Sequence, residues 1–195
     1  MGQRAVMIEP TINGQVIEAC QNGDREAFRV LFEAYKDKVY SIAFYSLGDR
    51  SVADDVTQQI FLKLFTAVRQ FRGESEFSTW LYRLVVNACI DERRKRRRLL
   101  PWGDADMMIR SDERKSQERS FALGELAEAV QNAVSELKPK FRQPILLKYV
   151  EGLSYDEIAA VMGCSKGTVA SRLNRGHSQL AKKLARFSEA SAWHD

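Results

Sequence analysis

The sequence predicts an all-α fold of two small helical domains, a three- to four-helix N-terminal domain and a C-terminal helix-turn-helix domain, joined by a flexible linker. Three observations support this fold class. Apolar residues recur at three- and four-residue steps through both ends of the chain, as on the buried face of an amphipathic helix. That pattern lapses from residue 99 to 122, which indicates a linker. Hydrophobic residues make up 45% of the 195 residues, enough for packed cores.

These patterns divide the chain into five parts. We expect a flexible N-terminus at 1–13, an N-terminal domain at 14–98, a linker at 99–122, a C-terminal domain at 123–187 and a tail at 188–195. Whether the two domains are splayed or packed together is left open by the sequence.

The N-terminal domain begins with a short helix around Gln15–Cys20 and continues with two long amphipathic helices. Asp24 suits the N-cap of the first long helix, because its carboxylate can accept hydrogen bonds from free backbone N–H groups. Gly48 suits its C-terminal end. Ser51 is predicted to start the second long helix. The core stripe of that helix is formed by Val52, Val56, Ile60, Leu64 and Val68, while Phe61, Leu62 and Phe65 add apolar surface away from the stripe.

A further helix is predicted from about Thr79 into a basic block, with Ser75 or Ser78 as its cap. Six consecutive basic residues, Arg93 to Arg98, form that block. The residues expected to face the core are Leu81, Leu84, Val85 and Ala88, and those on a different face are Trp80, Arg83, Asn87 and Asp91. The three long helices can enclose one small core.

The C-terminal third is predicted to hold four helices. Pro139 separates the first two, and Pro144 is tolerated only if it lies in a first turn. Ser154 and Glu157 then form a capping box that opens a short helix, which Gly163 ends. Ser165 is the expected N-cap of a longer helix that follows.

Positive charge gathers in two stretches. Residues 71–98 carry 8 basic and 4 acidic side chains, and residues 138–187 carry 10 and 3, whereas residues 1–70 carry 8 and 9. The net charge of +4 is therefore unevenly distributed. Two separate contacts with a polyanion fit this pattern better than a uniformly basic surface.

Residues 152–177 are typical of a helix-turn-helix: a short capped helix, a turn that opens with glycine, and a longer basic helix. The side chains expected to point outward at the start of the second helix are Lys166, Thr168, Ser171, Arg172 and Arg175. These residue types suit base edges and phosphates in the major groove of DNA. An ordinary helical hairpin with a solvated basic face is the alternative, and we favour DNA binding over it.

Residues 71–98 indicate a second kind of nucleic-acid contact. Aromatic rings such as Phe71 and Trp80 can stack on unpaired bases, Asn87 can bind a base edge, and arginines can hold phosphates. Core packing explains the aromatic residues equally well, and a solvated helix end explains the arginines equally well. From this stretch alone the two interpretations stay open.

Other classes of protein and site are disfavoured. The three cysteines, Cys20, Cys89 and Cys164, lie far apart in the sequence, and neither His177 nor His194 makes a metal-binding spacing with them. We expect small buried or half-buried thiols, no metal and no cofactor. The sequence has no apolar run of membrane-spanning length and no secretory signal, so we expect a cytoplasmic protein without membrane insertion. The sequence lacks catalytic motifs, so we disfavour an enzyme.

Three motifs, in this order and spacing, resemble the extracytoplasmic-function (ECF) group of bacterial RNA polymerase sigma factors, in its sigma-E-like form. Residues 54–62 (DDVTQQIFL) are similar to the core-polymerase-binding helix of that family. Residues 71–87 resemble its promoter-melting stretch through FRG, FSTWLYR and Asn87. Residues 149–173 resemble its C-terminal helix-turn-helix. The match covers the chain from about 24 to 186 apart from the linker.

The resemblance implies roles for these surfaces. The clamp helices of the largest subunit of core RNA polymerase would be bound by Asp54, Asp55, Gln58, Phe61 and Leu62. The protein would also contact the flap of the second-largest subunit. The residues that would contact the minus-ten promoter element are Phe71, Trp80, Arg83, Asn87, Arg93 and Arg94, with Phe71 and Asn87 lining a pocket for a flipped base. The helix-turn-helix residues named above would read the minus-thirty-five element as duplex DNA.

The resemblance also implies an anti-sigma factor, which could hold the protein at the inner membrane. The apolar Phe61 and Leu62, expected to be exposed, and linker residues 107–109 are candidate contacts for it. Gln59, Ala170 and the pair Gly176-His177 depart from the usual family residues, so the promoter sequence does not follow from the resemblance. The alternative function is a stand-alone helix-turn-helix regulator that binds a palindrome as a dimer.

Overall fold

The computed structural model describes residues 12–99 and 120–191, and within these ranges all regular structure is helical. The elements are α1 (Gly14–Gln21), α2 (Arg25–Leu47), α3 (Arg50–Ala67), the 3-10 helix η1 (Val68–Gln70), α4 (Phe77–Leu99), α5 (Ser120–Ser135), α6 (Pro139–Tyr149), α7 (Tyr155–Met162) and α8 (Lys166–Ser191). The prediction of an all-α fold with two helical domains is confirmed. Linker residues 107–109, predicted as contacts for a partner, lie outside the described residues.

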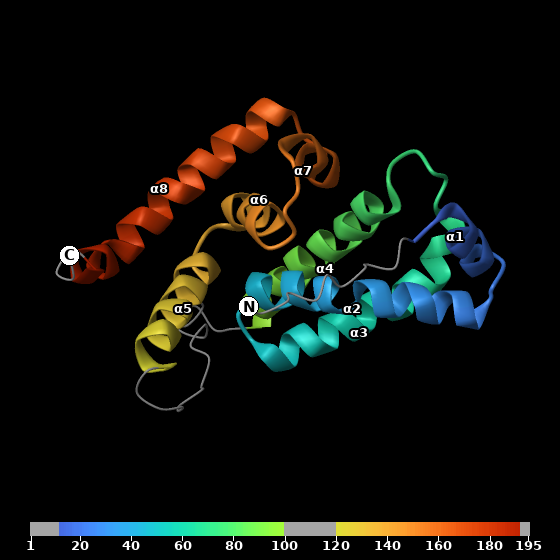
Figure 1. Cartoon of the computed structure of the whole chain (residues 1–195), viewed down its shortest axis with the longest axis horizontal. Coiled ribbons are helices and arrows are strands. Elements are labelled where there is room, and N and C mark those ends of the chain that lie inside the picture. The colour runs from blue at the N-terminus through green and yellow to red at the C-terminus, as the bar shows by residue number, and fades with distance from the viewer. Residues whose placement is uncertain (1–11, 100–119, 192–195) are drawn as a thin grey trace, which may run out of the picture.

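The N-terminal domain is built from α1 to α4, with α2, α3 and α4 packed side by side around one core (Figure 1). Completely buried side chains from each long helix meet there, among them Leu31, Leu64 and Leu81. The predicted core stripe of α3 is confirmed, since Val56, Ile60, Leu64 and Val68 are buried and Val52 is partly buried. Burial of these side chains is the main favourable contribution to folding of the domain.

Helix capping agrees with the sequence at one long helix and differs at the next. The Asp24 side chain accepts hydrogen bonds from the backbone N–H groups of Glu26 and Ala27, and Gly48 ends α2 in the left-handed conformation at φ 74°. The prediction that Ser51 starts α3 is wrong. Asp49 is the N-cap, because it has extended backbone and its carboxylate accepts from the N–H of Val52 at 3.1 Å.

The C-terminal domain contains a helix that continues through a proline. Pro144 lies inside α6 and Pro139 occupies the first turn, so Pro144 is tolerated outside the first turn, contrary to expectation. Pro144 has no N–H to donate to the carbonyl of Lys140, which removes one bond from the helix ladder. Its ring is buried, as are Phe141 and Ile145, and this burial of apolar surface offsets the loss.

The helix-turn-helix is present as α7 and α8. Ser154 and Glu157 form the predicted capping box, and Gly163 ends α7 at φ 59°. Hydrogen bonds from Ser154 hold the pKa of the Glu157 carboxyl below its ordinary value. At Gly176 the helix α8 passes so close to α6 that an added Cβ would lie 2.5 Å from Cδ1 of Ile145, which explains a glycine there.

The two domains pack against each other and share one continuous cluster of buried apolar side chains. Helix α6 and the end of α5 contact α2, and α7 contacts α4. Figure 1 shows α6 and α7 beside the N-terminal bundle, and α8 farther from it. This close packing answers the question that the sequence left open.

The thiols are placed as expected. Cys20 and Cys89 are buried and Cys164 is half-buried. Burial raises the pKa of the Cys89 thiol to about 12, so this group stays protonated and unreactive at neutral pH. Among the helices that the structure describes, none has the length and apolar character needed to cross a membrane.

Candidate nucleic-acid interface

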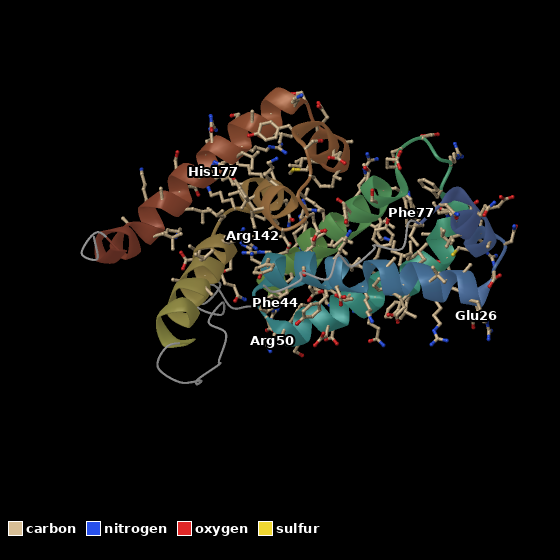
Figure 2. The ribbon with its side chains drawn as sticks, viewed as in Figure 1. Glu26, Phe44, Arg50, Phe77, Arg142 and His177 are labelled. Carbon is tan, nitrogen blue, oxygen red and sulfur yellow. The ribbon has the colours of Figure 1, made fainter. Side chains whose placement is uncertain are left out.

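An aromatic cluster forms where the loop after η1 meets the start of α4. The ring of Phe71 lies 5.4 Å from those of Phe77 and Trp80, and Phe77 lies 5.8 Å from Tyr35 of α2. Phe77 is buried, whereas Phe71 and Trp80 are half-buried. Figure 2 shows Phe77 at the amino end of α4. The cluster therefore has a buried base and two partly exposed rings, an arrangement that suits stacking on an unpaired base.

The loop that carries Phe71 is anchored by α1. The Gln21 side-chain amide donates to the carbonyl of Val68 at 3.1 Å and to that of Phe71 at 2.7 Å. These bonds fix the backbone beside the exposed ring. Sequence reasoning missed Gln21 and Tyr35, because both contacts join residues far apart in the chain and neither has a local pattern.

Asn87 and Arg83 continue this surface along α4. Both are exposed, and their spacing from Trp80 places the three side chains on one side of the helix. The guanidinium of Arg83 donates to the carbonyl of Ala160 in α7 at 2.5 Å. Asn87 thus lies in solvent on the face of α4 that carries Trp80, farther along the helix, while Arg83 contacts the helix-turn-helix.

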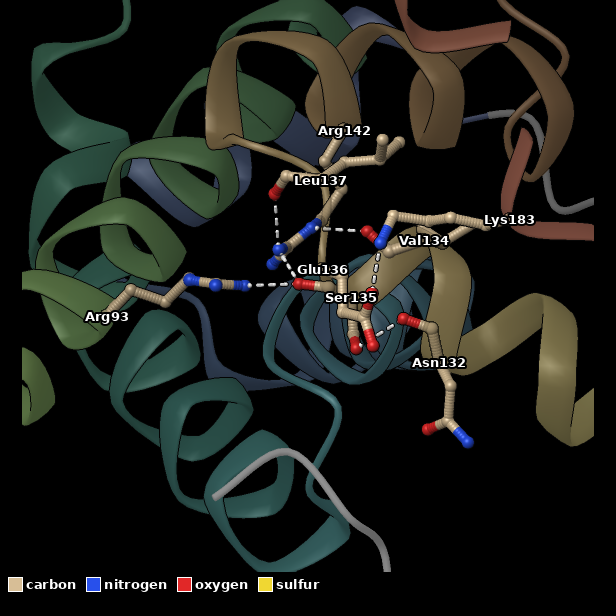
Figure 3. Close-up of polar contacts among 8 residues, drawn as sticks. All are labelled: Arg93, Asn132, Val134, Ser135, Glu136, Leu137, Arg142 and Lys183. Atoms are coloured by element: carbon tan, nitrogen blue, oxygen red, sulfur yellow. Dashed lines mark hydrogen bonds and ion pairs between the residues drawn. The ribbon is translucent and has the colours of Figure 1, made fainter. Parts of the chain in front are cut away.

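The arginines of the basic block have different partners. Arg93 donates to the carbonyls of Ser46 at 3.3 Å and of Ser135 at 3.2 Å (Figure 3), so its guanidinium points between the domains. Arg94 is exposed and lies 3.5 Å from Asp91. Arg96 lies 3.4 Å from the Asp49 carboxylate. Exposed ion pairs such as Arg94–Asp91 are weak, so Arg94 is readily available to a phosphate.

The start of α8 presents a basic face. Ser165 caps the helix by accepting from the N–H of Thr168 at 3.2 Å, as predicted. Lys166 lies 2.8 Å from Asp156 of α7, and Arg172 is half-buried with its guanidinium 3.7 Å from Sγ of Cys164. The remaining predicted contacts, Ser171 and Arg175, are exposed, and Thr168 is half-buried. These side chains share one end of the helix, as a major-groove contact requires.

An apolar groove of about 420 Å³ lies between α2 and α3 on another face. It is lined by Phe28, Phe32, Asp54, Thr57, Gln58, Phe61, Leu62 and Phe65. The expectation that Phe61 is exposed is wrong: it is only 6% exposed and packs edge-on against Phe32. Leu62 is 67% exposed. Asp55 is exposed beside the groove, so the five predicted docking residues lie in one region.

The groove also contains an unsatisfied polar group. The Thr57 hydroxyl is buried and has no hydrogen-bond partner among the described residues. A buried unpaired hydroxyl is unfavourable. Neither Thr57 nor the phenylalanines that α2 contributes had been predicted, because the lining is assembled from two helices.

Models of two protein families match the chain. The family described as sigma-70 region 2 matches residues 31–99, and the family described as sigma-70 region 4 matches residues 127–180. The first match includes α3, α4 and the aromatic loop, and the second includes α7 and the amino-terminal half of α8.

Curated relatives match over most of their length. The RNA polymerase sigma-H factor of Pseudomonas aeruginosa is 34% identical over 180 residues, which cover 87% of this chain and 92% of the relative. The ECF RNA polymerase sigma factor SigW of Bacillus subtilis is 32% identical over 86% of this chain and 94% of its own. The ECF RNA polymerase sigma-E factor of Escherichia coli K12 is 34% identical, covering 91% and 97%.

Solved structures share the fold. One is CnrH in complex with the cytosolic domain of CnrY, with a TM-score of 0.65 and 22% identity, covering 88% of this chain and 96% of that one. Another is the sigma factor RpoE in complex with the anti-sigma factor NepR from Bartonella quintana, with a TM-score of 0.66, 23% identity and coverage of 82% and 98%.

Proposed function

The chain belongs to the extracytoplasmic-function group of RNA polymerase sigma factors, and we propose that it binds core RNA polymerase and directs it to promoters by dividing DNA recognition between α4 and α8. One observation carries this division. The same chain has an aromatic, asparagine-bearing face suited to unpaired bases and a helix-turn-helix suited to duplex DNA. A stand-alone regulator needs only the second surface.

The α4 surface captures the minus-ten element. Phe71 and Trp80 stack on a base that leaves the duplex, Asn87 binds its edge, and Arg83 and Arg94 hold the neighbouring phosphates. Extruding a base costs a few kcal/mol, which stacking and edge hydrogen bonds offset. Arg93 contributes to this site once its guanidinium leaves the carbonyls that it contacts between the domains.

Helix α8 enters the major groove at the minus-thirty-five element. Ser171 and Arg175 are exposed on its amino-terminal half, and Lys166 and Arg172 flank them. The capped helix start and the ion pair of Lys166 with Asp156 orient this half before DNA arrives. Arginine and lysine bind guanine edges, while serine and threonine contact bases or phosphates.

Arg172→Ala is expected to weaken binding to the minus-thirty-five duplex by about 1–3 kcal/mol and to relax preference at one base pair, because a bidentate base contact is lost. Binding to a set of duplexes with single base-pair changes measures this effect. Lys182→Ala, which removes an exposed cation farther along α8, is the control. A uniform loss over all duplexes would instead identify Arg172 as a phosphate contact.

The α2–α3 groove binds core polymerase. Its apolar floor and exposed Leu62 provide hydrophobic area, and Asp54, Asp55 and Gln58 provide polar contacts at the edge. The partners on core polymerase are the clamp helices of the largest subunit, and the C-terminal domain contacts the flap of the second-largest subunit.

Leu62→Asp is expected to weaken the affinity for core polymerase at least about tenfold, because burial of a leucine contributes about 1.5–3 kcal/mol. The fold should tolerate the change, since the side chain is already in solvent. Fluorescence anisotropy of labelled protein titrated with core polymerase measures the affinity. Val30→Asp is the matched control, because Val30 is 44% exposed on α2 and does not line the groove. Equal effects of both changes would place docking elsewhere.

Regulation by an anti-sigma factor is also part of this proposal. Solved relatives in complex with such partners suggest that a partner covers these surfaces here. Of the two apolar contacts predicted on α3, Leu62 is exposed, whereas Phe61 contributes only to the groove floor. The protein then acts in the bacterial cytoplasm, and a membrane-bound partner could hold it at the inner membrane.

Run-off transcription tests the function directly. Purified protein is mixed with core polymerase free of sigma factors and with a library of bacterial promoters. Transcripts that depend on the protein are expected from a subset of promoters. A lack of transcripts from every promoter, together with a symmetric footprint by the protein alone, would favour the alternative of a dimeric helix-turn-helix regulator.

A further inference from the structure

The turn that carries Phe71 begins in the core and ends in solvent. At its start Val68 is completely buried, and the backbone N–H of Phe71 donates to the Val68 carbonyl at 3.1 Å. After Phe71 the chain continues as a mostly exposed loop to Glu76, in which Gly73 adopts the left-handed conformation at φ 72°. The Phe71 ring therefore lies at the boundary between the core and the exposed loop.

One side chain of α1, that of Gln21, spans this turn. Its amide nitrogen donates to the carbonyl of Phe71 at 2.7 Å and to that of Val68 at 3.1 Å. Both partners are acceptors, and the NH2 group of a glutamine offers two N–H donors. Gln21 thus holds both ends of a turn that lies 47 and 50 residues farther along the chain.

Gln21 is itself held by the end of α1. It is the last residue of that helix, and directly after it the N–H of Gly23 donates to the carbonyl of Cys20 at 3.0 Å. The Cys20 side chain is buried. Helix η1 also approaches this place, since a Cβ added to Gly23 would lie 3.5 Å from Nη2 of Arg69. Gln21 therefore connects two pieces of backbone that are each tied to the core.

The contact bears on the ring that follows the turn. Phe71 and Trp80 are half-buried, with their ring centroids 5.4 Å apart. Stacking on an unpaired base needs an exposed ring at a defined position and angle. A side chain that is held in place before its ligand arrives binds more tightly, because less conformational freedom is lost on binding.

We propose that Gln21 is a positioning residue for base capture: it fixes the turn from Val68 to Phe71, so that the Phe71 ring is in place before a base leaves the duplex. The inference rests on the proposed function, because that function assigns Phe71 to the minus-ten element. It adds that α1, which lies outside the residues matched by the two family models, takes part in promoter recognition through Phe71.

Gln21→Met tests this role, because methionine keeps the length of the side chain and removes both N–H donors. Holoenzyme formed from the full chain and core polymerase is titrated with a fluorescein-labelled single strand, taken from the minus-ten element of a promoter that gives a transcript in the run-off assay. Further strands carry one abasic site, placed at each position of the element in turn. The position at which the abasic site most weakens binding by the original chain marks the captured base.

The affinity for the intact strand divided by that for this abasic strand, here called the capture ratio, measures recognition of the base alone. We expect Gln21→Met to lower the capture ratio roughly 3- to 10-fold and to leave binding of the abasic strand unchanged. In a Phe71→Ala background, Gln21→Met should lower the ratio no further, because the ring through which it acts is absent.

Gln15→Met is the matched control. Gln15 is an exposed glutamine of the same helix, and its replacement should leave the capture ratio as it is. Gln21→Glu is the second test variant, since it keeps the shape of the side chain and replaces the donating nitrogen with an oxygen. Its added charge affects the intact and abasic strands alike, so the ratio should fall as it does for Gln21→Met.

An unchanged capture ratio in both Gln21 variants overturns the inference. Equal losses for the intact and abasic strands do so too, because they would show that Gln21 only supports the fold. A further fall of the ratio in the Phe71→Ala background would show that Gln21 does not act through Phe71. If the original chain gives no transcript from any promoter, the proposed function fails, and the inference that rests on it fails with it.

Discussion

Arg142→Met is expected to lower the free energy of unfolding by about 3–5 kcal/mol, because it leaves several buried acceptors unpaired. The guanidinium is fully buried and donates to four carbonyls, those of Val134, Ser135 and Leu137 at the end of α5 and that of Ser46 at the end of α2. Methionine fills the space of the aliphatic stem but leaves these acceptors without a donor. Each buried unpaired acceptor costs about 1–3 kcal/mol.

Denaturant unfolding followed by circular dichroism measures this loss. Because three of the four carbonyls belong to the C-terminal domain, α5 and α6 should unfold first, and the N-terminal helices should keep most of their stability. Arg175→Met is the matched control, since Arg175 is exposed on α8 and its replacement should change stability by less than about 0.5 kcal/mol. Equal stability of the two variants would show that the Arg142 bonds contribute little.

Asn87→Ala is expected to reduce open-complex formation by about 5- to 150-fold, which corresponds to the 1–3 kcal/mol of a bidentate contact with a base edge. Asn87 is exposed on the face of α4 that carries Trp80, so its truncation removes the base contact and leaves the fold intact. Permanganate reactivity of unpaired thymines in the minus-ten element measures promoter melting. Binding of the minus-thirty-five duplex by the C-terminal domain should be unchanged.

Asn22→Ala provides the control for the melting assay. Asn22 is also an exposed asparagine, and its role at the end of α1 is performed by its backbone N–H. Its replacement should leave promoter melting unaffected. Parallel losses of melting and of duplex binding in Asn87→Ala would contradict the proposed division of recognition between α4 and α8.

Local features of the fold were predicted well from the sequence. Asp24, Gly48, the Ser154–Glu157 box and Ser165 act at helix ends as expected, because a cap depends on residues within one turn of each other. The errors at helix starts were also local. Asp49 and Ser51 are both residue types that suit an N-cap, and Asp49 is the one with the extended backbone of an N-cap. Pro144 is tolerated inside α6, against expectation, because its burial offsets the lost hydrogen bond, and burial is a tertiary effect.

The sites were predicted only in part. Side-chain spacing on α4 and α8 placed the predicted residues of each helix together, since positions three and four apart share a face. The residues that support these sites were missed. Gln21, Tyr35 and Thr57 act through contacts with other elements, and a single sequence carries no signal of such pairs. Phe61 was taken as exposed because the residue that covers it, Phe32, comes from a different helix.

The sequence by itself determined the helices, their caps and the resemblance that identifies the family, because these depend on residue type and short-range spacing. Only the tertiary structure decided how the two domains meet. Arg142 and Ser46 are 96 residues apart, and Arg83 and Ala160 are 77 apart. Such contacts depend on which helix faces pack together, and hydrophobic patterns alone allow several packings. Arg83 and Arg93, predicted from the sequence as DNA contacts, therefore have a second set of partners, backbone carbonyls at the domain boundary.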